Sequence, residues 1–173
     1  MKSIRIAIAT ALVATAPLAL AQTAGPTDPQ IAAIVVTANQ VDMDAGKLAE
    51  MKGSNADVKA FGKQMASDHA GVSASAVQLV TKLKVTPEDN PTSQSLKAGG
   101  EKNVATLKGL SGAAFDKAYI ANEVAYHQQV LDAVDKVLIP SAKNDELKAL
   151  LVKVRPAFAS HLEHAKHVQA SLH

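Results

Sequence analysis

The sequence predicts an all-α protein in which four long helices and one shorter helix pack as an up-down bundle. Apolar residues recur at three- and four-residue spacings over most of the chain, which is the period of an amphipathic helix. No segment of strand length alternates apolar and polar residues, and the 173 residues include only 2 Tyr, 3 Phe and no Trp. Because each long helix has an apolar stripe to bury and the connections are short, an up-down bundle is the stable arrangement.

The first 21 residues have the pattern of an export signal. Lys2 and Arg5 supply the positive charge, residues 6–20 form an apolar run, and Ala19 and Ala21 fit a small-x-small cleavage site. The run is shorter than the stretch of about 20 apolar residues that a transmembrane helix needs. We therefore expect cleavage after Ala21 and a periplasmic or secreted protein.

The rest of the chain is expected to form one domain. Residues 22–27 are predicted to be a flexible lead-in, and residues 28–172 contain no long repeat, low-complexity tract or internal linker. No second apolar run is long enough to span a membrane. We therefore predict a single helical-bundle domain over 28–172.

Charge and cysteine content exclude several classes of function. The full chain has 18 Lys and Arg against 16 Asp and Glu, and removing Lys2 and Arg5 with the signal leaves a formally neutral chain. The basic residues form no aromatic-interleaved patch, so we expect no nucleic-acid partner. Because the chain has no Cys, it has no disulfide, no thiol nucleophile, no lipid anchor on Cys and no Cys-ligated metal.

The first two helices are delimited by capping residues and glycine. Thr27 or Asp28 is predicted to cap the first helix, with Pro29 in its first turn, and Gly53 to end it. Its apolar stripe is predicted to be Ile31, Ile34, Ala38, Val41, Ala45, Leu48 and Met51. Residues 54–57 are predicted to begin a second helix, which ends before the proline-containing loop at 86–91.

The shorter helix and the last two long helices follow that loop. The shorter helix is predicted over about 93–110, weakened by a glycine pair at 99–100. The next helix carries a strong apolar stripe from Ile120 to Leu138 and ends at Pro140. The last helix begins at residue 144 or 145, and Pro156 is predicted to kink or split it.

Polar residues that interrupt the apolar stripes are the candidates for function. His127 lies in the stripe of its helix, and His161 lies on the apolar side of the last helix. Helical spacing on the second helix puts Asp68 in the apolar stripe and His69 on its flank. On the first helix it puts Asp44 in the stripe with Asp42 beside it.

These residues predict a metal site in the interior of the bundle. Each long helix carries an Asp or His at or near its inner face, as in bundles whose metal ligands project inward from facing helices. Imidazole and carboxylate ligands without sulfur suit one divalent Zn, Fe, Mn or Cu ion. The candidate ligands or ligand partners are His69, His127, His161, Asp44, Asp42 and Asp68.

A purely structural interpretation stands beside the metal site. A single His in a helical core is more often a hydrogen-bonded core residue than a ligand, and Asp–His contacts between helices can fix their register. His164, His167 and His173 are predicted to lie on the surface, and Met43, Met51 and Met65 to pack in the core. The chain has no phosphate-binding loop and no nucleophile elbow, so we assign no catalytic residue.

Several blocks of the sequence resemble a bacterial secreted family known as domain of unknown function 4142, whose members are often labelled outer-membrane proteins. The resemblance covers about 28–170. The blocks are DMDAGKLA at 42–49, the segment from Val58 to Asp68-His69, LSGAAFDKAY at 110–119 with His127, and Pro156 followed by His161-Leu162 and Ala165.

The resemblance implies a ferritin-like bundle and a secreted location, but no established activity. Ferritin-like di-iron proteins use Glu-x-x-His on two helices, a motif that this sequence lacks. We therefore rank a metal oxidoreductase below two other functions. The first is an exported bundle that binds one divalent metal, and the second is an envelope-stress or protein-interaction module without metal.

Overall fold

The computed structural model describes residues 25–172, and these residues form helices without any strand, as the sequence predicts. The elements are α1 (Asp28–Lys52), α2 (Ala56–Leu83), α3 (Pro91–Lys108), α4 (Gly112–Ala133), a π-helix η1 (Val134–Leu138), α5 (Ile139–Ser141) and α6 (Asp145–Ser171). The export signal predicted at 1–21, and most of the lead-in predicted at 22–27, lie outside the described residues.

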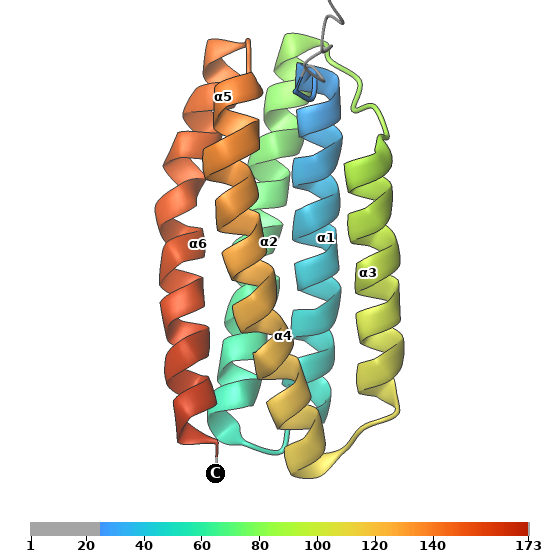
Figure 1. The fold of residues 1–173 in the computed structure, drawn as a ribbon, viewed down its shortest axis with the longest axis vertical. Helices are drawn as coiled ribbons and strands as arrows, with labels where there is room; N and C mark the ends of the chain where they lie inside the picture. The colour runs from blue at the N-terminus through green and yellow to red at the C-terminus, as the bar shows by residue number, and fades with distance from the viewer. Residues whose placement is uncertain (1–24, 173) are drawn as a thin grey trace, which may run out of the picture.

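The long helices lie side by side along the long axis of the molecule and alternate in direction (Figure 1). α1 packs against α2 and α3, α4 packs against α6, and α2 also touches α6. α3 lies beside α1 and has few contacts with α4. The interior is therefore enclosed mainly by α1, α2, α4 and α6.

Side chains cap the helices where the sequence predicts. The Thr27 hydroxyl accepts a hydrogen bond from the backbone N–H of Gln30, whose side chain in turn accepts from the Thr27 N–H. The side chains of Asn55 and Asn144 accept hydrogen bonds from backbone N–H groups in the first turns of α2 and α6, without the reciprocal bond seen at Thr27. These side chains satisfy N–H groups that have no partner within the helix.

Three details differ from the sequence predictions. The helix that begins at Gly112 passes into the π-helix η1 before it reaches Pro140. Of the two outcomes predicted at Pro156, a kink or a split, the split is wrong, because α6 continues through Pro156 as one helix. Met51, predicted to pack in the core, is 71% exposed, because it lies near the end of α1, beyond Ala49, the last buried residue of that helix.

Two glycines allow α1 and α2 to approach closely. A Cβ on Gly46 would lie 2.7 Å from the carbonyl oxygen of Gly62, and a Cβ on Gly62 would lie 2.7 Å from the Cβ of Ala49. Both distances are shorter than van der Waals contact. The close packing of these two helices therefore requires glycine at both positions.

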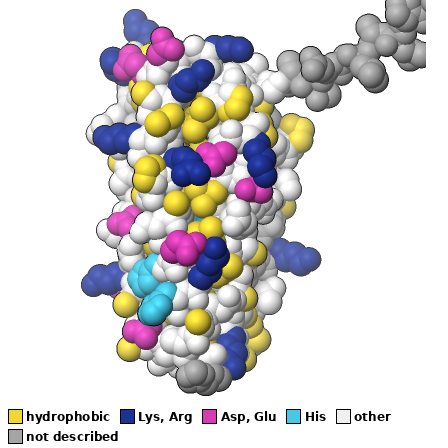
Figure 2. Space-filling model, turned by 60° about the vertical axis from the view of Figure 1, so that its left-hand side comes forward, with side chains coloured by type: hydrophobic (Ala, Val, Ile, Leu, Met, Phe, Trp, Pro, Cys, Tyr) yellow, Lys and Arg dark blue, Asp and Glu magenta, His cyan; other side chains and the backbone are white. Residues whose placement is uncertain are grey.

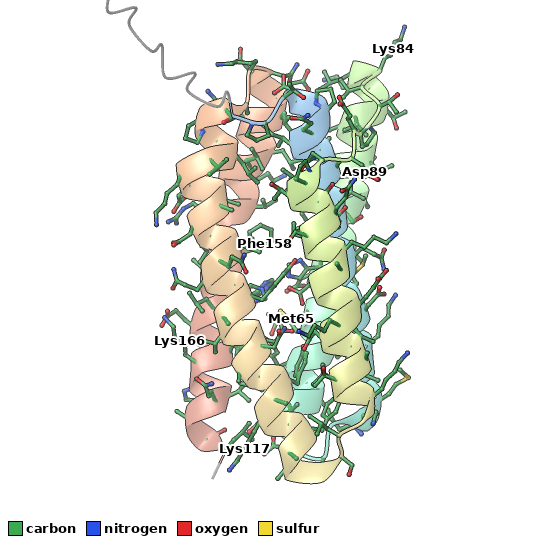
Figure 3. The ribbon with its side chains drawn as sticks, turned by 45° about the vertical axis from the view of Figure 1, so that its right-hand side comes forward. Met65, Lys84, Asp89, Lys117, Phe158 and Lys166 are labelled. Carbon is green, nitrogen blue, oxygen red and sulfur yellow. The ribbon has the colours of Figure 1, made fainter. Side chains whose placement is uncertain are left out.

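The apolar core is divided into two clusters along the bundle. One cluster includes Ile31, Ile34, Leu131, Val134, Leu138, Leu151, Phe158 and Leu162. The other includes Ala45, Leu48, Phe61, Met65, Phe115, Tyr119, Ile120, Ala165 and Val168. Buried polar side chains lie between the two clusters, and Figure 3 shows Phe158 and Met65, one from each cluster, pointing into the interior.

The face shown in Figure 2 carries charged side chains of both signs mixed with apolar ones. None of the described helices is both long and apolar enough to cross a membrane. Figure 3 shows Lys84, Asp89, Lys117 and Lys166 at the outside of the helices.

Candidate metal centre

A layer of buried polar side chains crosses the interior, with contributions from all four enclosing helices. We call it the polar layer. It consists of Asn39 and Asp42 from α1, His69 from α2, Glu123 and His127 from α4, and His161 from α6. Each of these residues is at most 3% exposed.

The hydrogen bonds of His69 leave one ring nitrogen free to act as a ligand. Its Nδ1 donates to the Oδ1 of Asn39 at 2.8 Å, and the amide nitrogen of Asn39 donates to the carbonyl of Val35 at 2.7 Å. These bonds assign the proton to Nδ1, so Nε2 carries a lone pair. That Nε2 lies 3.0 Å from the Oδ2 of Asp42 but does not form a hydrogen bond with good geometry.

His127 and His161 have the same arrangement. The Nδ1 of His127 donates to the carbonyl oxygen of Glu123 at 3.1 Å, which leaves the Nε2 lone pair 3.4 Å from the Oδ2 of Asp42. The Nε2 of His161 donates to the Oδ2 of Asp68 at 3.0 Å, which leaves its Nδ1 as the lone-pair atom. An outer hydrogen bond that fixes the tautomer is typical of metal-ligating histidines.

The three imidazole rings form a nearly equilateral triangle. The ring centroids of His69, His127 and His161 are separated by 5.3, 5.4 and 5.6 Å. Three imidazoles on one tetrahedral Zn²⁺, with bonds of about 2.0–2.1 Å, have centroids about 5.2 Å apart. The ring spacing therefore fits a shared ion. Phe158 stacks on His69 with its ring centroid 5.4 Å away.

Two carboxyl groups face these rings. Asp42 lies within contact distance of both His69 and His127, and the Oε2 of Glu123 lies 3.5 Å from the Nδ1 of His127. Ligand atoms of Asp42, Glu123 and His127 lie within 4.8 Å of one another, as do ligand atoms of the three histidines. The two groups share His127, so they form one connected site.

Burial strongly favours the uncharged form of every titratable group in the polar layer. It raises the pKa of Asp42 from 3.8 to about 7, and burial together with the charge of Asp42 raises the pKa of Glu123. Burial lowers the pKa of His69 to about 3 and that of His127 to about 4. It also lowers the pKa of His161, although Asp68 opposes this effect.

The polar layer leaves most of its inward-facing atoms without a hydrogen bond. Among the described residues, the buried side-chain atoms that lack a partner are both Oδ atoms of Asp42, Nε2 of His69, Nε2 of His127, Nδ1 of His161, Oε2 of Glu123 and the Tyr119 hydroxyl. The three nitrogens are the same atoms that carry the lone pairs. Buried polar groups are normally paired, so this set requires an explanation.

The structure brings together four of the six candidate residues. His69, His127, His161 and Asp42 lie in the polar layer, whereas Asp68 is exposed and contacts the layer only through His161. Asp44 is exposed and accepts a hydrogen bond from Gln40, away from the layer. The prediction that Asp44 and Asp68 face the interior is therefore wrong. The buried face of α1 includes Asp42, Ala45 and Ala49, and that of α2 includes Phe61, Met65 and His69.

Sequence reasoning missed Glu123 and Asn39 as members of the layer. Glu123 lies four residues before His127, so the two side chains share one face of α4, and this spacing is visible in the sequence. Asn39 gives no such signal. The predicted surface positions of His164 and His167 are confirmed, since both are exposed, while His173 lies outside the described residues.

Comparison with known proteins identifies a family but no function. A family model described as "Domain of unknown function (DUF4142)" matches residues 13–168. No curated protein and no solved structure gives a significant match. The chemistry of the polar layer therefore has to be argued from its own geometry.

Proposed function

We propose that this chain, which belongs to the DUF4142 family of domains of unknown function, binds one divalent metal ion in the polar layer. The proposed ligands are the lone-pair nitrogens of His69, His127 and His161 together with the carboxylate of Asp42. Glu123 supplies a second buried carboxyl group, whose ligand atom lies within 4.8 Å of those of Asp42 and His127.

The observation that carries this proposal is the set of buried ligand atoms without hydrogen-bond partners. Three imidazole nitrogens and the Asp42 carboxyl converge from four helices, and none of these atoms is satisfied by the protein. A cation at their centre would accept all of these lone pairs at once. The proton on the opposite nitrogen of each ring is already held by Asn39, Glu123 or Asp68.

Closing the site on an ion requires only small side-chain movements. Ligand atoms on one tetrahedral ion lie about 3.4 Å apart, so the ligand atoms of the three histidines, which lie within 4.8 Å of one another, must approach by at most about 1.4 Å. The Oδ2 of Asp42 already lies 3.0 Å from the Nε2 of His69 and 3.4 Å from that of His127. Nitrogen and oxygen ligands without sulfur suit Zn²⁺, Fe²⁺, Mn²⁺ or Cu²⁺. Because the two ligand groups share His127, we propose one ion rather than two.

The test is the metal content of protein purified without a histidine tag and exposed to each of the four metals. We expect about one ion per chain, and a rise in thermal stability that reaches about 2.7 kcal/mol at a hundredfold excess over Kd. His127→Gln should lose the ion. His164→Gln is the matched control, because His164 is an exposed histidine on α6, and it should retain the ion.

The second candidate is a module in which the polar layer only fixes the packing of the helices, as in an envelope-stress or protein-interaction protein. The hydrogen bonds of His69 to Asn39 and of His161 to Asp68 favour it, because they satisfy one nitrogen of each ring without metal. Here His127→Ala lowers stability and leaves metal content unchanged. A metal stoichiometry near zero with no thermal shift would support this candidate and overturn the metal site.

We further propose that α1, α2, α4 and α6 form a ferritin-like four-helix bundle within one domain, with α3 as an additional helix. We propose that the chain is exported and cleaved after Ala21. N-terminal sequencing of the protein from the periplasmic fraction tests this cleavage. Two ions per chain with bridging carboxylates would favour a ferritin-like metal oxidoreductase instead.

A further inference from the structure

A groove opens between α3 and α4 and leads inward to the polar layer. Its volume is about 680 Å³, and its walls come from α1, α3, α4, η1 and α6, together with His69 of α2. Figure 3 looks between α3 and α4, with α1 behind them. The volume is within the range of about 300–1,000 Å³ that is typical of small-molecule sites.

The walls of the groove carry no charged side chain among the described residues. Of the described residues that line it, none is Asp, Glu, Lys or Arg, although 20% of the chain is charged. The polar side chains among them are amides, hydroxyls and the two histidines. The outer face in Figure 2, in contrast, mixes charges of both signs. A ligand in the groove would find no counter-ion, so an uncharged apolar molecule fits it best.

The inner end of the groove is the polar layer itself. His69, His127 and Asn39 line it there, together with Phe158, and each histidine is at most 3% exposed. A helix or another protein laid across the surface would cover the opening without reaching atoms this deep. The depth therefore favours a small elongated molecule with one polar end.

Two features of the walls agree with a binding site. The π-helix η1 contributes Val134 and Val137 to one wall, and π-helical turns inside α-helices occur frequently at functional sites. On the opposite wall, Gly99 has no atom within 4 Å of the position where a Cβ would lie. A side chain at position 99 therefore has room to enter the groove.

We propose that this groove binds an uncharged, elongated apolar small molecule whose single polar end reaches His69 and His127. This site goes beyond metal binding and does not require the ion. In the metal-free protein the polar end would donate a hydrogen bond to the Nε2 of His69 or His127, which has no other partner.

The test uses N-phenyl-1-naphthylamine, an uncharged apolar dye that fluoresces when it leaves water. We expect saturable binding of one dye per chain to the purified protein, both after treatment with chelator and with metal. The charged analogue 1-anilinonaphthalene-8-sulfonate has the same rings and an added sulfonate. It should bind at least about tenfold more weakly, because the groove offers no cation.

Two substitutions fill the groove from opposite walls. Gly99→Phe on α3 and Ala125→Phe on α4 should each weaken dye binding at least about tenfold. Gly71→Phe on α2 is the matched control, because Gly71 also has open space around it but does not line the groove, and it should bind the dye normally. Circular dichroism and thermal unfolding verify that each variant is folded.

Equal dye binding by Gly99→Phe and the unmodified protein, or no saturable binding at all, would overturn the proposal. A dimer that Gly99→Phe dissociates would also overturn it, because a second copy of the chain would then cover the groove. These results are independent of metal content. Failure of this proposal is therefore distinguishable from failure of the metal site.

Discussion

Replacing Gly62 by Ala tests the close contact between α1 and α2. The added Cβ would lie 2.7 Å from the Cβ of Ala49, 2.7 Å from the carbonyl oxygen of Gly46 and 2.9 Å from the backbone nitrogen of Glu50. Two of these three atoms belong to the backbone of α1, which cannot move aside as a flexible side chain would. The two helices must therefore separate by several tenths of an ångström.

The expected cost follows from this separation. A gap of about 0.5–1 Å forfeits a quarter to a half of the dispersion energy of each contact across the interface. Overpacking of this kind costs up to about 3 kcal/mol, and the higher helix propensity of Ala returns about 1 kcal/mol. We expect a net loss of about 2 kcal/mol in the free energy of unfolding, or roughly 4–8 °C in Tm for a domain of this size.

Urea unfolding of the unmodified protein, Gly62→Ala and Gly71→Ala measures this effect. Gly71 lies in the same helix with no atom within 4 Å of its would-be Cβ, so Gly71→Ala should stabilise the protein by about 0.5–1 kcal/mol. If Gly62→Ala also stabilised the protein, or left it unchanged, the inferred helix contact would be refuted. Because Asp42 and His69 face each other across the same two helices, Gly62→Ala should also weaken metal binding.

Three further predictions concern pH and helix connections. Stability of the metal-free protein falls as the pH drops below 6.5, because burial holds the pKa of His69 near 3, with a slope of up to about 1.4 kcal/mol per pH unit for one histidine. Asp42 acts in the opposite direction, since its raised pKa costs stability as the pH rises from about 4 to 7. In urea unfolding over pH 4–7, the free energy of unfolding should therefore rise less steeply with pH for His69→Gln and more steeply for Asp42→Asn. Zn²⁺ binding at pH 6 should release more protons than at pH 8, because Asp42, with a pKa of about 7, must ionise to bind. Calorimetry in buffers of different ionisation enthalpy measures this proton release. Equal release at both pH values would contradict the prediction. Asp116→Ala should cost about 1–3 kcal/mol in urea unfolding, because the Asp116 carboxylate accepts hydrogen bonds from Ser54 and Asn55 at the α1–α2 connection. It should leave metal content unchanged, because Asp116 is not a member of the polar layer.

The helices could be predicted closely because their ends are local features. Thr27 caps α1 through a hydrogen bond to a residue three positions away, and such a bond depends on the neighbouring sequence alone. The same holds for the cap at Asn55. The π-helix η1 was not predictable in this way, because nothing in its sequence of five residues distinguishes it from the α-helix before it.

The polar layer could be predicted only in part, because burial depends on the rotation of each helix. Asp42 and Asp44 are two residues apart and therefore lie about 200° apart around α1, so only one of them can face the interior. The apolar stripe does not decide between them. Packing against α2 does, since Gly46 sets the contact face and Asp42 lies one turn before it on that face. Likewise, on α2, His69 faces the interior of the bundle and Asp68 does not.

The division of the core by the polar layer has a consequence for the alignment of the helices. Apolar side chains alone tolerate a helix that slides along its neighbours by one turn, because a Leu or Ile can replace another in most positions. A slide of about 5.4 Å here would carry His127 or His161 into an apolar cluster and leave Asp42 facing hydrocarbon. Each of the four enclosing helices contributes to the layer, so each is held at one axial position. The polar layer therefore fixes the axial positions of all four helices relative to one another.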